Sequence, residues 1–376
     1  MSLATLDAAA RQLAPFGYDQ ATQDRFAARA QRRVDNAVTG VLTPLPPGQL
    51  ALLPPLGTAE RARLRERGLA MLQHGQVGAL VLAGGMATRF GGVVKAVVEA
   101  YRDEQGRPRS FLESKLDDIA RLADHAGAPI PVLVMSSFAT HAAIERHVAE
   151  HHLAGPRHPI TVFPQLVALR LTPDGALVHD AAGDLSPYAT GHGDLTWALR
   201  RGDALAQFRA GGGTTLLMSN VDNLGATLDP AILGLHAELG SAITAEVVHK
   251  IPGDKGGAPA LLDGTPQIIE GFRFPPGFDQ DAIDVFNTNT FVLDAAAIDR
   301  DFDLPYYRVE KQVDGATVIQ FERLVGEVTA RVPSRFVLVP RSGADCRFLP
   351  VKDPEELERQ RPLILEVTRS HRSLAG

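Results

Sequence analysis

Short apolar runs alternate with helix-like stretches through the middle of this chain, and this order constrains its fold more than any other feature. The runs and stretches follow one another as Val77–Leu82, Phe111–Ala123, Ile130–Met135, Ala139–His151, Thr214–Met218, Pro230–Leu239 and Ile243–Val248. Strands that alternate with helices predict βαβ units and a mainly parallel sheet. We therefore expect an α/β fold with a Rossmann-like core and a mixed, mainly parallel sheet.

The two ends of the chain differ from this core. Residues 1–75 are rich in alanine and arginine at helical spacing, and prolines between Pro44 and Pro55 interrupt them. We expect three segments, an N-terminal helical extension over 1–75, a catalytic core over 76–340 and a C-terminal segment over 341–376. Further elements are expected as a hairpin turn at Asp263-Gly264, strands at Val285–Leu293 and Phe336–Val339, and one helix after Pro350.

The composition excludes several classes of protein. Of 376 residues, 45% are hydrophobic and 22% are charged, as in a globular protein with a large core. The formal net charge of −6 gives no reason to expect a nucleic acid or an anionic membrane as partner. A single cysteine, Cys346, excludes an internal disulfide and a multi-cysteine metal site. No apolar run approaches the ~20 residues of a membrane span, and the first residues lack a signal-peptide pattern. We therefore expect a cytoplasmic protein.

The loop after the first apolar run carries the strongest sign of function, because ligands of open α/β sheets bind at the carboxyl ends of the strands. It reads Leu82-Ala83-Gly84-Gly85-Met86-Ala87-Thr88-Arg89-Phe90-Gly91-Gly92-Val93-Val94-Lys95. Gly84 and Gly85 let backbone N–H groups approach an anion, and Arg89 and Lys95 add positive charge, so the loop suits a triphosphate. It matches neither Gly-x-x-x-x-Gly-Lys-Ser/Thr nor Gly-x-Gly-x-x-Gly, which argues against a P-loop enzyme and a dinucleotide-binding dehydrogenase.

Five further motifs follow this loop in order. They are Phe163-Pro164-Gln165, Gly191-His192-Gly193-Asp194, Asn220-Val221-Asp222-Asn223-Leu224-Gly225-Ala226-Thr227, Phe286-Asn287-Thr288-Asn289 and Arg347-Phe348-Leu349-Pro350-Val351-Lys352. The loop alone also resembles that of the molybdenum-cofactor guanylyltransferases. The ordered set, from Val77 to Asp353, resembles the UDP-sugar pyrophosphorylase family. The resemblance implies a GT-A-type nucleotidyltransferase core that transfers UMP from UTP to glucose 1-phosphate and releases pyrophosphate.

The resemblance also implies a role for each motif. Attack on the α-phosphorus of UTP requires positioned phosphates and neutralised charge, and Mg²⁺ held by one or two carboxylates is the usual cation. Asp222, just after the apolar run Thr214–Met218, is the implied Mg²⁺ ligand. The groups implied on the reacting phosphates are Arg89, Lys95, His192 and Lys352. The groups implied on the nucleotide and the sugar are Gly84, Gly85, Gln165, Gly191, Asn223, Glu270, Asn287, Asn289 and, as a weaker candidate, Lys311.

The chain departs from the family pattern in its first loop and at its end. Ala87 replaces the second loop glycine, the spacing to Lys95 is one residue shorter, and Val94 stands where proline is common. Eukaryotic relatives carry a C-terminal β-helix used in oligomer formation. This sequence ends at Gly376, so we expect no such domain, and no oligomeric state carries over. The alternatives are a UDP-N-acetylglucosamine or broad UDP-sugar pyrophosphorylase, and a nucleotide-sugar sensor without turnover.

Two other constellations suggest different chemistry. His147 and His151 lie four residues apart on an expected helix, with His141 and His152 nearby, and this spacing can chelate zinc. No glutamate follows His147 as in His-Glu-x-x-His, so we expect a solvated helix face. Asp301-Phe302-Asp303 has the form of a glycosyltransferase metal motif, but the adjacent proline and tyrosines favour a surface loop.

Overall fold

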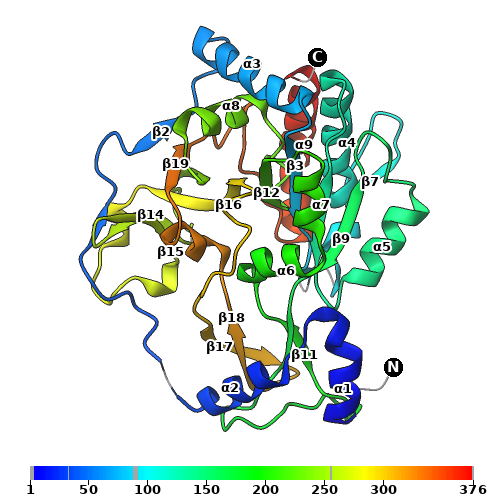
Figure 1. Ribbon diagram of the computed structural model, residues 1–376, viewed down its shortest axis with the longest axis vertical. Coiled ribbons are helices and arrows are strands. Elements are labelled where there is room, and N and C mark those ends of the chain that lie inside the picture. Colours follow the sequence, from blue (N-terminus) through cyan, green and yellow to red (C-terminus); the bar gives the residue numbers. More distant parts are fainter. Residues whose placement is uncertain (1–3, 33, 88–91, 255, 375–376) are drawn as a thin grey trace.

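The computed structural model describes residues 4–32, 34–87, 92–254 and 256–374, and Figure 1 shows how their elements are arranged. The helices are α1 (Leu6–Leu13), α2 (Gln20–Ala30), α3 (Ala59–Gln73), α4 (Phe111–Ala126), α5 (His141–Glu150), α6 (Leu195–Arg201), α7 (Ala204–Ala210), α8 (Pro230–Leu239) and α9 (Pro354–Leu374). Short 3-10 turns are η1 (Ala14–Phe16), η3 (Lys95–Val97), η4 (His192–Asp194), η5 (Gly271–Arg273), η6 (Gln280–Ala282) and η7 (Val325–Ala330).

Eight of the nineteen described strands form one sheet, and the others form small sheets of two or three strands. They are β1 (Leu42–Pro44), β2 (Leu50–Leu52), β3 (Val77–Leu82), β4 (Met86–Ala87), β5 (Val93–Val94), β6 (Glu99–Arg102), β7 (Pro108–Ser110), β8 (Val132–Ser136), β9 (Ile160–Pro164), β10 (Val167–Leu169), β11 (Pro187–Ala189), β12 (Thr215–Asn220), β13 (Ile243–His249), β14 (Ala258–Leu262), β15 (Thr265–Ile269), β16 (Val285–Asp294), β17 (Tyr307–Val313), β18 (Ala316–Glu322) and β19 (Ser334–Leu338).

The main sheet has eight strands in the order β2-β19-β13-β16-β12-β3-β8-β9. Every neighbouring pair is parallel except the two pairs that contain β16, which is antiparallel to β12 and to β13. The expected α/β fold with a mixed, mainly parallel sheet is therefore confirmed. The expected hairpin is also present, since Asp263 and Gly264 join β14 to β15 with φ angles of +49° and +79°.

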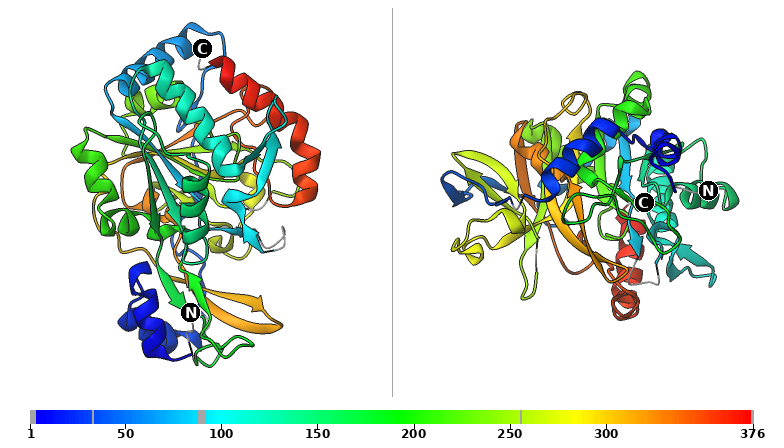
Figure 2. Two further views of the ribbon diagram at one scale, coloured as in Figure 1. Left: turned by 90° about the vertical axis from the view of Figure 1, so that its right-hand side faces the viewer. Right: turned by 90° about the horizontal axis from the view of Figure 1, so that it is seen from below.

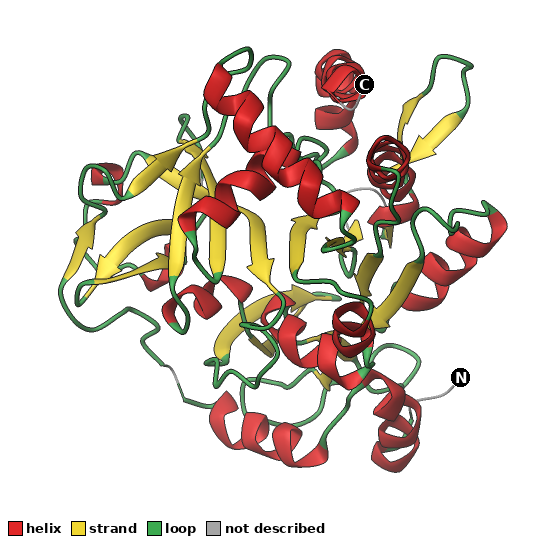
Figure 3. Cartoon of the chain, turned by 45° about the horizontal axis from the view of Figure 1, so that its top comes forward, coloured by secondary structure: helices red, strands yellow, loops and turns green. Residues whose placement is uncertain are grey.

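Both faces of the sheet are covered (Figure 3), so β3 is buried throughout and β12 is buried up to Ser219. Successive side chains of β3 point to opposite faces. Val77, Ala79 and Val81 pack in the core that α3, α4, α8 and α9 complete. Leu80 and Leu82 pack in the second core, with α6, α7 and the β14–β15 hairpin. Within the described part of the chain, no helix combines the length and apolar character that a bilayer span needs.

The N-terminal segment contains the expected helices, and two short strands that the sequence analysis does not predict. Helices α1 and α2 are present, and they pack with β10, β11 and the β17–β18 hairpin at one end of the molecule (Figure 2). Between α2 and α3, however, β1 pairs with β14, and β2 forms the edge strand of the main sheet beside β19. The prolines between Pro44 and Pro55 favour extended backbone, and β14 and β19 supply its hydrogen-bond partners.

Helices α3 and α8 approach each other closely because each has a glycine at the crossing. A Cβ on Gly68 would lie 1.8 Å from the carbonyl oxygen of Pro230, and a Cβ on Gly234 would lie 2.0 Å from that of Leu64. Neither contact leaves room for a methyl group. The two glycines therefore fix the position of α8, whose N-terminus follows the loop after β12.

Gly234→Ala is expected to lower the free energy of unfolding by about 1–3 kcal/mol, because overpacking shifts the backbone of both helices. Urea denaturation measures this change. Gly211→Ala at the end of α7 is the matched control, since its nearest atom would lie at an ordinary 3.4 Å. A more stable Gly234→Ala variant, as helix propensity alone would give, contradicts the close crossing.

Candidate active site

The loops after β3 and β12 start side by side at the carboxyl edge of the sheet. Leu82 of β3 is the pairing partner of Asn220 of β12, so Gly84 and Asp222 each lie two residues beyond the same pair. The two loops therefore begin together at the edge of the sheet where ligands of open α/β sheets bind.

Gln165 reaches the same edge from the end of β9. Its N–H donates to the carbonyl oxygen of Ser136 at 2.9 Å, which continues the pairing of β8 with β9. A Cβ on Gly84 would lie 2.4 Å from Nε2 of Gln165, so Gly84 leaves room for that amide. The neighbouring Gly85 is exposed. The structure thus places Gln165 against the loop after β3 that contains Gly84 and Gly85, which we call the glycine loop. The predicted role of Gln165 is contact with the nucleotide.

Asp222 and Lys95 form an ion pair at this edge. Nζ of Lys95 lies 2.7 Å from Oδ2 of Asp222 and also donates to the carbonyl oxygen of Val351. Lys95 begins η3, directly after the short β5, and its ammonium lies 5.8 Å from the ring centroid of Phe111 at the start of α4. The carboxylate of Asp222 therefore already attracts a cation.

The C-terminal segment joins the site by pairing with the loop between β12 and α8, residues 221–229, which we call the Asp222 loop. The N–H of Val351 donates to the carbonyl oxygen of Asp222 at 3.1 Å, and that of Leu224 donates to the carbonyl oxygen of Leu349 at 3.1 Å. Lys352, the next residue, has an exposed side chain, and its N–H donates to Glu356 at 2.6 Å. The chain therefore delivers Lys352 beside Asp222 from the far end of the sequence.

His192 is held in one tautomer by the turn that it starts. Gly191 has φ +97°, and a Cβ there would lie 2.3 Å from the carbonyl oxygen of Arg323. This close approach lets the N–H of Val325 donate to Nδ1 of His192 at 3.0 Å. Burial lowers the pKa of His192 to about 4. The imidazole is therefore neutral at pH 7, with Nδ1 as acceptor and the proton on Nε2.

A bulge in β16 turns Asn289 toward β12. The register of β16 with β13 shifts between Glu246 and Val247, and Asn289 has φ +58°. Its Nδ2 donates to Oδ1 of Asn220 at 2.9 Å, while its N–H donates to Oδ1 of Asn287 at 3.0 Å. Bulges commonly redirect side chains at active sites. Asn220, the first residue of the motif that contains Asp222, is therefore brought together with Asn289 by this hydrogen bond.

Glu270 follows β15 and lies between two glycines. Its carboxylate oxygens lie 3.1 Å from the positions that Cβ atoms would take on Gly257 and Gly326. Burial, followed by the nearby carboxylate of Glu327, raises the pKa of Glu270 to about 7. A carboxyl group that is half protonated near neutral pH can both donate and accept hydrogen bonds to hydroxyl groups.

The raised pKa of Glu270 predicts a pH-dependent stability. A carboxyl group whose folded pKa exceeds its unfolded value of 4.5 stabilises the fold below that value, and this contribution is lost as the pH rises through 7. Glu270→Gln removes the group, so relative to the variant the wild type should lose about 3 kcal/mol between pH 4.5 and pH 7. Urea denaturation of both proteins across this range measures it. Parallel pH profiles contradict the raised pKa.

Three further predicted site residues are Asn223, Lys311 and Arg89. Asn223 is 1% exposed, its Oδ1 accepts from the N–H of Leu349 at 2.8 Å, and its Nδ2 donates to the carbonyl oxygen of Arg347 at 3.3 Å. Both ends of the amide bind the chain itself, and the expected substrate role of Asn223 stays a prediction. Lys311 lies on β17 with Glu322 at 3.6 Å, and its substrate role stays a prediction. Arg89 lies outside the described residues.

The Asp301-Phe302-Asp303 motif lies in an irregular segment between β16 and β17. Asp301 and Asp303 are exposed, and Asp301 forms an ion pair with Arg200 of α6. The expected surface loop is therefore confirmed. The one ion pair named here joins it to α6 and not to the carboxyl edge of the main sheet.

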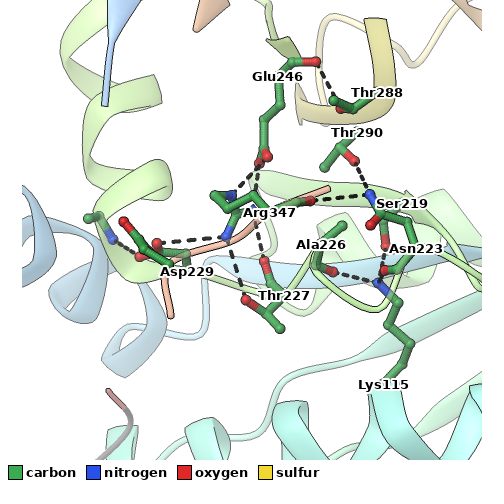
Figure 4. A network of polar contacts seen from close by, with 12 residues as sticks. Lys115, Ser219, Asn223, Ala226, Thr227, Asp229, Glu246, Thr288, Thr290 and Arg347 are labelled. Atoms are coloured by element: carbon green, nitrogen blue, oxygen red, sulfur yellow. Dashed lines mark hydrogen bonds and ion pairs between the residues drawn. The ribbon is translucent and has the colours of Figure 1, made fainter. Parts of the chain in front are cut away.

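A buried lysine supports the Asp222 loop from below (Figure 4). Nζ of Lys115 donates to the carbonyl oxygens of Asn223 at 2.6 Å and Ala226 at 2.5 Å, and to Oγ of Ser219 at 3.2 Å. Burial lowers the pKa of Lys115 to about 7. The sequence held a signal that we did not use, since a lysine interrupts the apolar face that Phe111, Leu112, Leu116 and Ile119 form on α4.

A buried ion pair holds the other side of this loop. Nη2 of Arg347 lies 2.6 Å from Oε1 of Glu246, and Nε lies 2.8 Å from Oε2 (Figure 4). Nη2 also donates to the carbonyl oxygen of Thr227 at 3.0 Å. Arg347 belongs to the motif that ends in Lys352, and Thr227 belongs to the motif that contains Asp222. The two motifs are thus joined by charge as well as by backbone pairing.

Comparisons with known proteins agree with this arrangement. The model of a family described as UTP–glucose-1-phosphate uridylyltransferase matches residues 52–369. The UTP–glucose-1-phosphate uridylyltransferases of Encephalitozoon cuniculi and Saccharomyces cerevisiae are 28% and 31% identical to this chain over 74% of its length. The chain spans 56% and 58% of the lengths of these two relatives.

A solved structure supports the fold independently. The UDP-glucose phosphorylase from Trypanosoma brucei superimposes with a TM-score of 0.74 at 22% identity, covering 93% of this chain and 77% of that one. The family match includes the glycine loop, the Asp222 loop and the motif that ends in Lys352, which confirms the resemblance seen in the sequence. The chain therefore belongs to the UTP–glucose-1-phosphate uridylyltransferase family.

Proposed function

We propose that this chain transfers UMP from UTP to glucose 1-phosphate, giving UDP-glucose and pyrophosphate. The observation that carries the proposal is the meeting of Asp222, Lys95 and the Val351–Lys352 backbone at the carboxyl edge of the sheet. One carboxylate and two lysines next to a glycine loop suit a substrate with several phosphates. The cytoplasmic location expected from the sequence is part of this proposal.

In the proposed reaction, a phosphate oxygen of glucose 1-phosphate attacks the α-phosphorus of UTP. The bond from that phosphorus to the oxygen bridging the β-phosphate breaks, and pyrophosphate leaves with the electron pair. Lys95 and Lys352 neutralise the charge on the phosphates. His192 contributes a neutral Nε2–H donor, because its Nδ1 is occupied by the N–H of Val325. No proton transfer to the sugar phosphate is required.

The residues present suit Mg²⁺. The carboxylate of Asp222 is partly exposed and already attracts the ammonium of Lys95. Mg²⁺ in nucleotide enzymes is held by one or two carboxylates together with substrate phosphates and waters, so Asp222 would hold it without further side chains. When bound, the ion supplies charge neutralisation at the phosphate oxygens.

The remaining site residues set the specificity in this proposal. The amide of Gln165 has the donor and acceptor that the O4 and N3–H groups of uracil require. Asn287, Asn289 and Glu270 supply amides and a carboxyl group for sugar hydroxyls. Two contacts support this division between nucleotide and sugar. Gln165 lies against Gly84 in the loop after β3, whereas Asn289 of β16 binds Asn220 on the opposite side of β12.

Pyrophosphate release tests the proposal. The protein is incubated with Mg²⁺ and UTP in the presence of glucose 1-phosphate, galactose 1-phosphate or N-acetylglucosamine 1-phosphate, with ATP and GTP as base controls. Release with UTP and glucose 1-phosphate above the other pairs is the expected result. Faster release with N-acetylglucosamine 1-phosphate overturns the sugar assignment. Binding of UTP without release from any pair overturns the enzyme and favours a sensor.

A further inference from the structure

The histidine-bearing helix α5 is only in part the solvated face that the sequence predicts, since His151 and His152 are exposed whereas His141 and His147 are partly buried. Its side chain His147 is only 11% exposed, because α5 packs against the start of α4, whereas His151 is 48% exposed at the end of the helix. The packing brings Glu113 of α4 to the two imidazoles. The sequence separates Glu113 from His147 by a strand and a loop, so the spacing of the histidines alone does not reveal it.

Three side chains converge here. Oε2 of Glu113 lies 3.7 Å from Nε2 of His147, and the second carboxylate oxygen, Oε1, lies 3.4 Å from Nδ1 of His151. Each residue offers one ligand atom to a set whose three atoms lie within 4.8 Å of one another. The imidazole ring centroids are 4.2 Å apart. In a tetrahedral site with metal–ligand distances of ~2.1 Å, neighbouring ligand atoms lie ~3.4 Å apart, so small side-chain rotations close the set.

Glu113 is already oriented for this purpose. Ser110 and Glu113 form a capping box, in which Oε2 accepts the N–H of Ser110 at 2.7 Å and the Ser110 hydroxyl accepts the N–H of Glu113 at 3.1 Å. The same hydroxyl lies 2.9 Å from Nε2 of His147. The capping box therefore fixes the carboxylate in the first turn of α4, and little conformational freedom is lost when it binds a metal.

The surrounding charge tolerates a cation. Nη1 of Arg109 lies 3.8 Å from Oε1 of Glu113, but the guanidinium also lies 3.2 Å from Oδ2 of Asp103 and 3.7 Å from Oδ2 of Asp117. Asp117 and Asp103 thus offset its charge, although Asp103 is shared with Arg107, whose Nε lies 2.9 Å from Oδ2. Two imidazole nitrogens and one carboxylate oxygen suit Zn²⁺, whereas Mg²⁺ prefers oxygen ligands.

We propose that Glu113, His147 and His151 bind one Zn²⁺ ion, with water in the fourth position, at a site separate from the Asp222 carboxylate. The ion would join the start of α4 to α5. Phe111, the first residue of α4, lies against the ammonium of Lys95, so the zinc site would fix the helix end that supports the glycine loop. Its role is structural and does not depend on the reaction proposed above.

Equilibrium dialysis tests this site without any activity measurement. Untagged protein is dialysed against Zn²⁺ in buffer that contains millimolar Mg²⁺, which competes for oxygen-ligand sites, and bound zinc is measured by mass spectrometry. The expected result is one zinc per chain. His151→Ala should weaken binding by at least about 10–100-fold, since a direct ligand matters no less than the groups that orient one. Glu113→Gln should weaken it as well.

His152→Ala is the matched control, because it removes the next histidine, which is exposed and outside the cluster. It should bind zinc like the wild type. Thermal denaturation gives a second readout: Zn²⁺ should raise the Tm of the wild type and of His152→Ala but not that of His151→Ala. Wild type without stoichiometric zinc, or equal zinc binding by His151→Ala, overturns the proposal. An equal Tm increase with Mg²⁺ alone overturns the zinc assignment.

Discussion

Lys352→Ala should lower kcat for pyrophosphate release by about 100-fold or more, the size found when one donor that stabilises a developing charge is removed. The reason is the position of Lys352 next to Asp222, where its ammonium would neutralise phosphate charge. The hydrogen bond from Val351 to Asp222 fixes this position. Because the side chain is exposed, its loss should leave the fold intact. Initial rates with saturating UTP and glucose 1-phosphate, together with UTP affinity from calorimetry, measure the effect.

Lys250→Ala is the control for that variant, since Lys250 is a surface lysine whose Nζ donates to the carbonyl oxygen of Gln280. It should retain the wild-type kcat. A Lys352→Ala enzyme with a near-normal rate would remove Lys352 from the group of residues that contact the reacting phosphates, and a protein that no longer binds UTP would show that its role is in binding.

Arg347→Met should lower the free energy of unfolding by about 3–5 kcal/mol, because it leaves the buried carboxylate of Glu246 without its partner. Arg347 is 1% exposed and Glu246 is fully buried, so neither charge can reach water. The loss of the donor to Thr227 should also loosen the Asp222 loop. Urea denaturation gives the midpoint and the slope from which this change is obtained.

The double variant Arg347→Met with Glu246→Met separates the two possible causes. If the cost of Arg347→Met comes from the uncompensated charge, replacing both partners should restore most of the stability. A double variant as unstable as the single one would show instead that packing around the side chains dominates. A single variant as stable as the wild type would contradict the structural role of the pair.

The order of the elements was predictable from local signals. Apolar runs of strand length, helical periodicity and Asp263-Gly264 identify most of the main sheet and the β14–β15 hairpin, because each signal acts within a few residues. The strands β1 and β2 escaped prediction. They are three residues long, and their extended backbone is stabilised by pairing with β14 and β19 more than 200 residues away.

The candidate site was likewise predictable only in part. Residue type and motif order identify Asp222, Lys95 and His192, because phosphate and cation chemistry restrict which side chains can serve. They do not show that the amide of the neighbouring Asn223 binds the backbone of Arg347 and Leu349, a contact that only the structure reveals. Whether Asp222 or Asn223 faces solvent depends on how the segment from Arg347 to Leu349 pairs with this loop.

The sequence by itself determined the fold class, the family and the chemical character of the site, since these follow from periodicity, spacing and functional groups. Only the tertiary structure decided which charges are buried and what they hold. Lys115 and Arg347 could not be recognised as supports of the Asp222 loop, nor Glu113 as a neighbour of His147 and His151, until the sheet brought their elements together. The physical reason is that burial raises the cost of an unpaired charge, and burial is a property of the packed fold.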